Sequence, residues 1–449
     1  MPDLLRASSS RLRRHWQVLC HDIGHRTAGS RGEQRAADYI EAQLRRLRLE
    51  HVHQETFEFP NWSSSRCRLT VAPGGRGRGA RPRSIRTVRA GVYSSATPPR
   101  GVRGPLAYLE TGREVDFTQP LKGRIGLIVG GLAIADDRLR ALIVASGLKA
   151  MLMVDTRAPF DWALTAGAAP HWVDGLHVPM AGLSFNDAIG LVEQMPLRAH
   201  LTLDARSFPA TSQNVMGEIV GRTHPDEVIL VSGHHDCVEE NVGADDNGSG
   251  VLYMLELARI FSARRPPRTI RFISYGTEER LSIGAYLHMR GLSRREQRRI
   301  VLCVNPDSIS SAVGCDQVRI TGTEPLARLV ERTWGRRNHP VRITRAIHPY
   351  SDHFPFNIVG VPSISLGRTV LASGGCWQLH SVHDNTDHVS AAVLARTIDT
   401  SADLIDRIAN ARALPFPRSI APGLKREVDA AGRQIYRHPW SPGDFDYDR

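Results

Sequence analysis

The stretch EVILVSGHHDCVEENVGADDNGSGVLYMLELARIF, residues 227–261, predicts a strand, a polar loop and a helix in that order. EVILVSG is a short apolar run typical of a strand that is buried on both faces. His234, His235 and Asp236 follow it directly, and SGVLYMLELARIF has the length and apolar positions of a helix. Such a strand brings its last residues to the carboxyl edge of an open α/β sheet, where these sheets collect ligands and catalytic groups.

Four further clusters of acidic and imidazole side chains follow toward the C-terminus. They are GADDNGSG with Asp245 and Asp246, YGTEE with Glu278 and Glu279, NPDS with Asp307, and LHSVHDNTDHV with His380, His383, Asp384 and Asp387. Glu278 and Glu279 end the apolar run TIRFISYG, and Asp307 ends IVLCVNPD. Adjacent carboxylates at a buried strand end are costly unless a cation or a proton compensates their charge. The clusters together therefore predict a two-metal hydrolase site.

Each cluster also has an ordinary explanation when it is taken alone. Asp246 stands where a carboxylate commonly caps a following helix. In the last cluster, His383 and His388 are alternatives to His380 as a metal ligand. The joint occurrence favours the metal site, because the ends of several strands meet at one edge of a sheet.

Apolar runs and helical segments alternate from residue 212 to 411. This alternation predicts an α/β fold with a mostly parallel central sheet and helices on both faces. Upstream, residues 31–47 have helical spacing, with Ser30 as a cap and Glu33 three residues later. HVHQETFEF, residues 51–59, alternates in the manner of a strand.

The sequence changes character between residues 89 and 206, where β-like runs alternate with glycine and polar turns. These runs are GPLAYLE, GRIGLIVGG, ALIVASG, AMLMVD and VPMAGLS. We predict a small β-rich inserted domain at 89–206, between an N-terminal part of the main domain at 1–88 and its main part, with the metal site, at 207–414. The tail at 415–449 is rich in Pro, Arg and Asp and is predicted to be irregular.

Composition excludes several classes of protein. The net charge is +12, but the basic residues are nearly all Arg and form no stripe interleaved with aromatics, so we expect no nucleic-acid partner. No apolar run approaches the roughly 20 residues that cross a bilayer. The N-terminus lacks the apolar core of a signal peptide, so we expect a cytoplasmic protein with six free cysteines. The oligomeric state is not predicted.

The ordered clusters resemble the zinc aminopeptidase family that also contains glutamate carboxypeptidase and the catalytically silent transferrin receptor. RTAGSRGEQRAADYIEAQL resembles the N-terminal segment of that family, and YSDHFPFNIVGVPSISL resembles its Ser-Asp-His segment before a strand. The likeness covers roughly residues 20–62 and 212–411. The segment between them resembles a protease-associated domain, which several zinc peptidases carry as an insert; an unrelated small α/β insert is the alternative.

The resemblance implies a site with two zinc ions, although other divalent cations would also suit the ligands. His234, Asp246 and Asp307 would hold one ion, and Asp246, Glu279 and His380 would hold the other. Glu278 would be the general base. Asp236 and Asp384 would support the ligands without binding metal themselves.

The activity that the resemblance implies is hydrolysis of N-terminal residues from peptides by a water that the two metals activate. A carboxypeptidase, a dipeptidase or another amidohydrolase on the same scaffold is the first alternative, and a non-catalytic binding protein is the second. Leu379 stands where some relatives have a tyrosine before the histidine ligand. Ser351, Asp352 and His353 suggest a serine hydrolase, but adjacent residues do not readily form a triad and no GxSxG turn is present.

Overall fold

The computed structural model describes residues 6–74, 81–129, 137–154, 161–163, 170–173, 175–369 and 378–437. The chain divides into two compact units. Unit 1 comprises the chain up to Phe59 together with Thr211–Arg433, and unit 2 comprises Pro60–Ala210 together with the chain from Gln434 onward. The chain leaves unit 1 within strand β1 (Glu50–Ser63) and returns to it within β10 (Arg206–Ile219).

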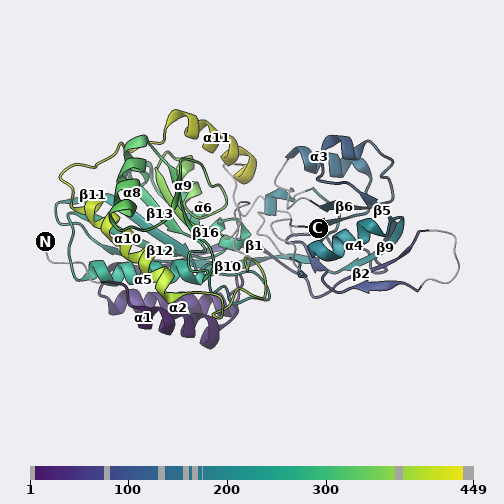
Figure 1. The fold of residues 1–449 in the computed structure, drawn as a ribbon, viewed down its shortest axis with the longest axis horizontal. Coiled ribbons are helices and arrows are strands. Elements are labelled where there is room, and N and C mark those ends of the chain that lie inside the picture. Colours follow the sequence, from purple (N-terminus) through teal and green to yellow (C-terminus); the bar gives the residue numbers. More distant parts are fainter. Residues whose placement is uncertain are drawn as a thin grey trace. The chain divides into compact units, whose positions relative to one another are not determined.

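Unit 1 is built on a mixed sheet with a parallel centre (Figure 1). The described strands follow the order β1, β10, β12 (Arg268–Tyr275), β11 (His224–His234), β13 (Ile300–Pro306), β16 (Ser363–Thr369), β14 (Cys315–Thr321) and β15 (Arg342–Thr344). Strands β12, β11, β13 and β16 run parallel, while β10 and β14 pair antiparallel with the two ends of that group. The predicted α/β fold with a mostly parallel centre is therefore confirmed.

Helices cover both faces of this sheet. One face carries α1 (Ser9–Trp16), the π-helix Gln17–Ile23, α2 (Arg31–Arg46), α5 (Gly248–Ser262), α8 (Glu324–Arg336) and α10 (Ala391–Asn410). Ile270 and Phe272 of β12 point into the core beneath these helices. Tyr275 points to the other face, where its ring lies near His288 of α6 (Ile283–Gly291), which in turn lies near Phe356 of α9 (Phe354–Ile358).

Close packing of α5 on β11 determines where the loop between them lies. A Cβ on Gly233 would lie 2.8 Å from the backbone of Gly250, and a Cβ on Gly250 would lie 2.4 Å from Oδ1 of Asn247, so both positions favour glycine. The N-terminus of α5 is capped by the Asn247 side chain, which accepts from Gly250 N at 2.8 Å. Asp246, one residue earlier, is thereby left free of the capping role that its sequence position had suggested.

Two predicted elements are wrong. ALIVASG, residues 141–147, lies mostly in helix α3 (Asp137–Ser146), because a short apolar run alone does not distinguish a strand from a buried helix. The tail predicted to be irregular contains α11 (Pro422–Tyr436), in which Val428 and Ile435 are buried at helical spacing. Residues 438–449 of that tail lie outside the described residues.

Unit 2 contains a second mixed sheet. The order of its described strands is β3 (Arg83–Ile85), β2 (Cys67–Pro73), β9 (Leu197–Leu203), β5 (Val102–Tyr108), β6 (Ile125–Val129), β7 (Ala150–Val154), β8 (Met180–Leu183) and β4 (Arg89–Ala90). Strands β5 to β8 are parallel neighbours, and α3 and α4 (Phe185–Glu193) contribute to cores that contain Ile143 and Leu191.

The division of the structure differs from the predicted boundaries, most of all at the start of the insert. The predicted boundary after residue 88 falls at Phe59 in the structure, and the return predicted after residue 206 falls at Ala210. The reason is that β2 pairs with β9 and β4 pairs with β8, so residues 67–90 join partners more than 90 positions away.

Two further expectations can be compared with the structure. The described cysteines Cys20, Cys67, Cys237, Cys303 and Cys315 are free, as predicted, and Cys376 lies outside the described residues. Within the described ranges, no helix combines the length and the apolar character needed to span a bilayer.

Candidate metal centre

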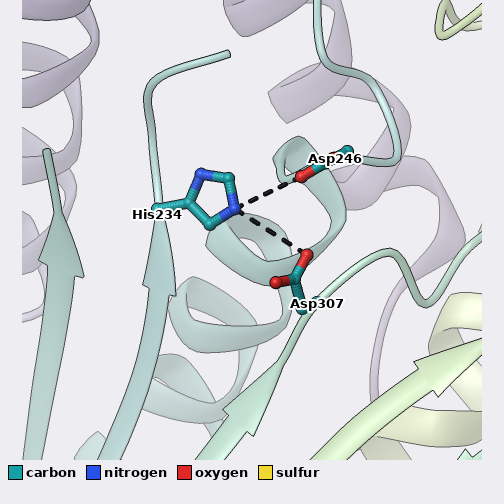
Figure 2. A group of neighbouring side chains, drawn as sticks. All are labelled: His234, Asp246 and Asp307. Atoms are coloured by element: carbon teal, nitrogen blue, oxygen red, sulfur yellow. Dashed lines mark ion pairs between the residues drawn. The ribbon is translucent and has the colours of Figure 1, made fainter. Parts of the chain in front are cut away.

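His234 ends β11 and points toward two carboxylates from other elements (Figure 2). Its Nε2 atom lies 3.2 Å from Oδ1 of Asp246 and 3.7 Å from Oδ1 of Asp307. Asp246 lies just before α5, and Asp307 directly follows β13, the strand beside β11. The potential ligand atoms of these three residues lie within 4.8 Å of one another, which is close enough to surround one cation.

A second group adjoins the first and shares Asp246 with it. The other carboxylate oxygen of Asp246, Oδ2, lies 3.1 Å from Nε2 of His380. The same nitrogen lies 3.3 Å from Oε2 of Glu279, which directly follows Glu278 after β12. These ligand atoms also lie within 4.8 Å of one another. Each oxygen of Asp246 thus faces a different histidine, as a carboxylate that bridges two metal ions would.

The residues present fit divalent cations. Asp246, Asp307, Glu278 and Glu279 converge on two imidazoles, and none of the four pairs with Lys or Arg within the described ranges. His234 Nε2 and Glu279 Oε1 are buried without a hydrogen-bond partner. Buried carboxylates at this density need a compensating positive charge, and the combination of imidazole and carboxylate ligands suits zinc or a similar ion.

The protein environment shifts the pKa values of the acidic residues in different directions. Burial raises the pKa of Glu278 well above its ordinary range, and the nearby charges of Asp352 and Asp307 raise it further while His234 opposes them. Burial, together with the charge of Asp246, raises the pKa of Glu279 to about 7. Burial would also raise the pKa of Asp246, but its contacts with His234 and His380 outweigh that effect and lower it.

Glu278 lies beside the first ligand group without belonging to it. Its Oε2 atom is 3.6 Å from His234 Nε2, and its Oε1 atom accepts a hydrogen bond from Ser282 Oγ at 3.0 Å. The side chain is about nine-tenths buried. A carboxylate in this position is free to accept a proton at the metal centre.

Asp236 connects the first histidine to the pair of glutamates. Its Oδ1 lies 3.4 Å from Nδ1 of His234, and its two oxygens accept from the backbone N–H groups of Glu278 and Glu279, each at 3.0 Å. An orienting partner on the second nitrogen of a histidine is usual for metal ligands. Asp236 therefore positions the candidate ligand and the candidate base together.

Asp384 performs a similar function for the bridging residue. Its carboxylate accepts from the backbone N–H groups of Asp245 and Asp246 at 2.7 and 3.0 Å. Asp245 points elsewhere, because its carboxylate accepts from both N–H and Oγ of Ser310. The structure thus brings all five predicted ligands, Glu278 and both predicted supports into one centre.

Glu33, Arg26 and Ser351 support the metal centre through contacts that the sequence did not indicate. Glu33, noted only for its place near a helix cap, accepts from Thr277 N at 3.1 Å and from Ser212 Oγ at 2.9 Å. Thr277 has a left-handed backbone with φ of 57°, so this contact stabilises a strained turn just before Glu278. The only sequence signal for Glu33 was the resemblance of RTAGSRGEQ to the N-terminal segment of a family. That resemblance did not indicate which residues Glu33 would contact.

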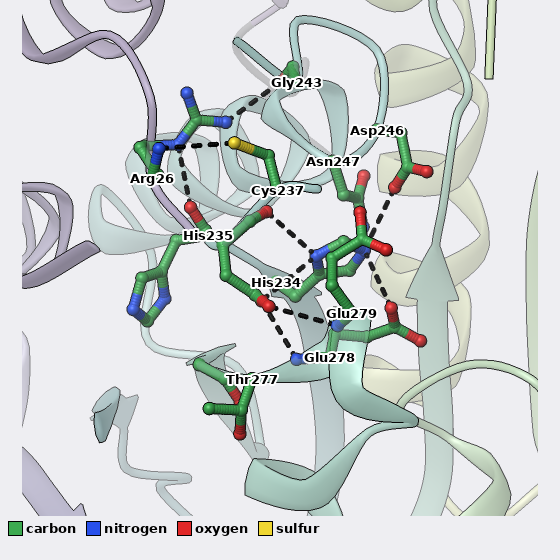
Figure 3. Close-up of polar contacts among 12 residues, drawn as sticks. Arg26, His234, His235, Cys237, Gly243, Asp246, Asn247, Thr277, Glu278 and Glu279 are labelled. Atoms are coloured by element: carbon green, nitrogen blue, oxygen red, sulfur yellow. Dashed lines mark hydrogen bonds and ion pairs between the residues drawn. The ribbon is translucent and has the colours of Figure 1, made fainter. Parts of the chain in front are cut away.

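Arg26 belongs to the same segment and holds the loop between the first two clusters (Figure 3). Its buried guanidinium donates to the backbone carbonyl oxygens of His235, Val242 and Gly243 at 2.7, 2.6 and 3.0 Å. The backbone N–H of Arg26 also donates to Cys237 Sγ at 3.3 Å. Cys237 thus lies in this loop as a buried acceptor and is not part of either ligand group.

The Ser-Asp-His segment supports the metal centre and does not form a triad. Ser351 Oγ donates to Asp307 Oδ2 at 2.8 Å and accepts from Asn305 Nδ2 at 2.8 Å. Neither ring nitrogen of His353 has a hydrogen-bond partner among the described residues. Of the alternative ligands in the last cluster, His383 and His388 lie ring to ring at 6.2 Å and enter neither ligand group.

A parallel-centred α/β sheet that carries paired metal-ligand groups beside a free carboxylate defines a metal-dependent hydrolase. Comparison with known proteins specifies the family. The family model described as Peptidase family M28 matches residues 214–405, and over these residues the chain is similar to that family. The enzyme is accordingly a metallopeptidase.

Individual relatives agree with this assignment. Aminopeptidase YwaD of Bacillus subtilis is 27% identical over 390 residues, which cover 85% of this chain and 80% of the relative. Carboxypeptidase Q of Bos taurus is 26% identical over 382 residues, covering 78% and 75% of the two chains. The crystal structure of BSAP, a zinc aminopeptidase from Bacillus subtilis, superposes with a TM-score of 0.72 at 24% identity, covering 94% of this chain and 100% of that one.

Proposed function

We propose that this protein is a zinc aminopeptidase that releases N-terminal residues from peptides and binds two zinc ions. The observation that carries the proposal is the shared carboxylate of Asp246, whose two oxygens face His234 and His380 next to the free carboxylate of Glu278. The names of the relatives YwaD and BSAP support both the aminopeptidase activity and the metal.

The bound zinc pair would lower the pKa of a water molecule and polarise the scissile carbonyl. The protein itself supplies the proton transfer. Glu278 accepts a proton from the attacking water and delivers it to the leaving amine. Ser282 and the backbone contacts to Asp236 hold Glu278 at the edge of the ligand groups.

The test is Glu278→Gln, which keeps the shape of the side chain and removes the base. We expect two zinc ions per chain by elemental analysis, as in the wild type, and a loss of kcat of at least about 100-fold on leucine p-nitroanilide. Glu331→Gln, the same substitution at an exposed position of α8, serves as the control and should retain full activity. An unchanged rate for Glu278→Gln would show that another group is the base.

A carboxypeptidase or dipeptidase activity is the second candidate, because carboxypeptidase Q is also a relative. Blocking each end of a peptide separates the two activities. An aminopeptidase cleaves a peptide with an amidated C-terminus and spares one with an acetylated N-terminus, whereas a carboxypeptidase does the reverse. A protein with neither activity and no bound zinc would support the non-catalytic alternative.

A further inference from the structure

Thr277, Glu278 and Glu279 follow one another in the turn after β12 (Figure 3). Side chains from other elements hold the backbone of this turn. Four consecutive N–H groups, from Gly276 to Glu279, each donate to the oxygen of a buried side chain. In order, the acceptors are Asn214 Oδ1 at 3.3 Å, Glu33 Oε1 at 3.1 Å, and Oδ1 and Oδ2 of Asp236, each at 3.0 Å. The position of the candidate base therefore depends on these three side chains.

The turn needs such support because its backbone is strained. Thr277 has a left-handed backbone with φ of 57°, and a β-branched residue rarely adopts this conformation. Leu281 and Ser282, at the end of the same turn, are also left-handed, with φ of 67° and 51°. A strained backbone persists only where its surroundings hold it. Without an acceptor for its N–H group, Thr277 would relax and displace Glu278, the next residue.

Glu33 reaches this turn from α2, more than 240 positions away in the sequence. Its Oε1 atom accepts from Thr277 N and from Ser212 Oγ, and its Oε2 atom accepts from Gly29 N at 2.7 Å. The residue is 1% exposed. A Cβ on Gly276 would lie 2.9 Å from Oε1 of Glu33, so the glycine lets the turn pack directly against this carboxylate.

A carboxylate at this place costs stability. The three hydrogen-bond donors of Glu33 are all neutral groups, and no Lys or Arg pairs with it in the described part of the chain. Burial and the nearby charge of Asp236 raise the pKa of Glu33 well above its ordinary range. A buried carboxylate without a cationic partner is unfavourable for folding, and proteins retain such conflicts chiefly at functional sites. A neutral side chain would serve the fold better.

We propose that Glu33 is a positioning residue for the reaction, which holds Thr277 so that the carboxylate of Glu278 stays where it can accept a proton. The inference rests on the proposed function, in which Glu278 is the base. A displacement of about 1 Å can lower a rate about 100-fold, so a small relaxation of the turn has a large effect. Zinc binding should respond less, because Glu279 keeps its own backbone contact with Asp236.

Glu33→Met tests the proposal, because methionine has a similar unbranched shape and no oxygen to accept the N–H of Thr277. We expect kcat on leucine p-nitroanilide to fall at least about 20-fold, while KM changes less than about twofold and the zinc content stays that of the wild type. Glu33→Gln keeps one oxygen and should lose about three- to tenfold in kcat. Glu41→Met, at a partly exposed position of the same helix, is the control and should keep the wild-type kcat and KM.

Hydrogen exchange provides a readout that needs no turnover. In the metal-free proteins, backbone amides of residues 276–283 should exchange at least about tenfold faster in Glu33→Met than in the wild type or Glu41→Met, while those of β11 keep their rate. If the wild type does not cleave leucine p-nitroanilide but exchange in the turn depends on Glu33, the proposed function fails and the role of Glu33 in holding the turn stands.

Two results would overturn the proposal. One is a folded Glu33→Met protein with the wild-type kcat; should that variant not fold, a wild-type kcat for Glu33→Gln has the same meaning. The other is a loss of kcat that is accompanied by an equal rise in KM and by loss of zinc, because Glu33 would then support the fold of the whole centre and not the base.

Discussion

Asp246 has more influence on metal binding than any one of the other ligands, because it belongs to both ligand groups. We expect Asp246→Asn to leave almost no bound zinc after dialysis. Asp307→Asn should retain about one zinc per chain, because Glu279, His380 and Asp246 remain together in that variant. Elemental analysis of the two dialysed proteins makes the comparison, and an Asp246→Asn protein with one tightly bound zinc would contradict the bridging role.

The Asp236→Asn variant tests how much the supporting carboxylates contribute to zinc binding. Asn at this position offers one oxygen and one NH2 group, so one of the backbone N–H groups of Glu278 and Glu279 loses its acceptor. We expect zinc affinity to fall by about 10- to 100-fold, the usual cost of removing a residue that orients a metal ligand. Competition with a chelator measures it, and Asp226→Asn, at an exposed site on β11, should leave affinity unchanged.

Four of the metal ligands were predictable from local sequence because each follows an apolar run or lies in a glycine-rich turn, whereas the choice of His380 rested on the family resemblance. The roles of Glu33 and Ser351 were not predictable, since each depends on a contact with a residue more than 40 positions away. Hydrogen bonds of this kind leave no local pattern in the sequence. Ser351 shows this best, because its neighbours suggested a triad while its hydroxyl supports Asp307.

At the scale of elements, Glu256 of α5 holds the start of the chain against unit 1. Its carboxylate, about 1% exposed, accepts from Arg11 Nε at 2.9 Å, Arg259 Nη2 at 2.8 Å and Ser8 N at 3.2 Å. Burial alone would raise the pKa of Glu256, but the two arginines outweigh it and lower the pKa. The contribution to stability is therefore fully present above the unfolded value of about 4.3 and is lost as pH falls through the lower folded value.

Glu256→Gln should accordingly destabilise the protein by about 1.5–3 kcal/mol at pH 7, as expected for hydrogen bonds to a charged group. The difference from the wild type should shrink as the pH falls below about 4. Urea unfolding at several pH values measures it, with Glu331→Gln on the exposed face of α8 as the matched control. A difference that stays constant down to pH 3 would mean that the charge of Glu256 contributes nothing.

Helices whose apolar residues follow a clear helical spacing were predicted correctly. Segments whose apolar pattern suits both a strand and a helix were not. The predicted helix at 31–47 is α2, with Ser30 accepting from Glu33 N as its cap. ALIVASG failed because its run of apolar residues suits both a strand and a buried helix. Helix α11 was missed because the Pro and Arg content of the tail obscured the helical spacing of Val428 and Ile435.

At the scale of the whole molecule, the two units have separate sheets and separate hydrophobic cores. Their boundaries were the least predictable feature, because the order of strands in the second sheet depends on pairings between distant segments. Residues 67–90 carry no local sign that they pair with β8 and β9. The change in composition predicted the interior of the insert. It did not predict that residues 67–90 contribute the first strands of the same sheet.

Separate cores predict two steps in thermal unfolding, and zinc should act on only one of them. All five candidate ligands belong to unit 1. A ligand at 100 times its Kd stabilises the state that binds it by about 2.7 kcal/mol, and a domain of about 150–250 residues gains about 2–4 °C in Tm per kcal/mol. Scanning calorimetry of the metal-free protein, with and without zinc, should therefore show one transition rising by roughly 5 °C or more while the other stays fixed. Asp246→Asn, which disrupts both ligand groups, should abolish the shift; if zinc moved both transitions equally in the wild type, the two units would not unfold independently.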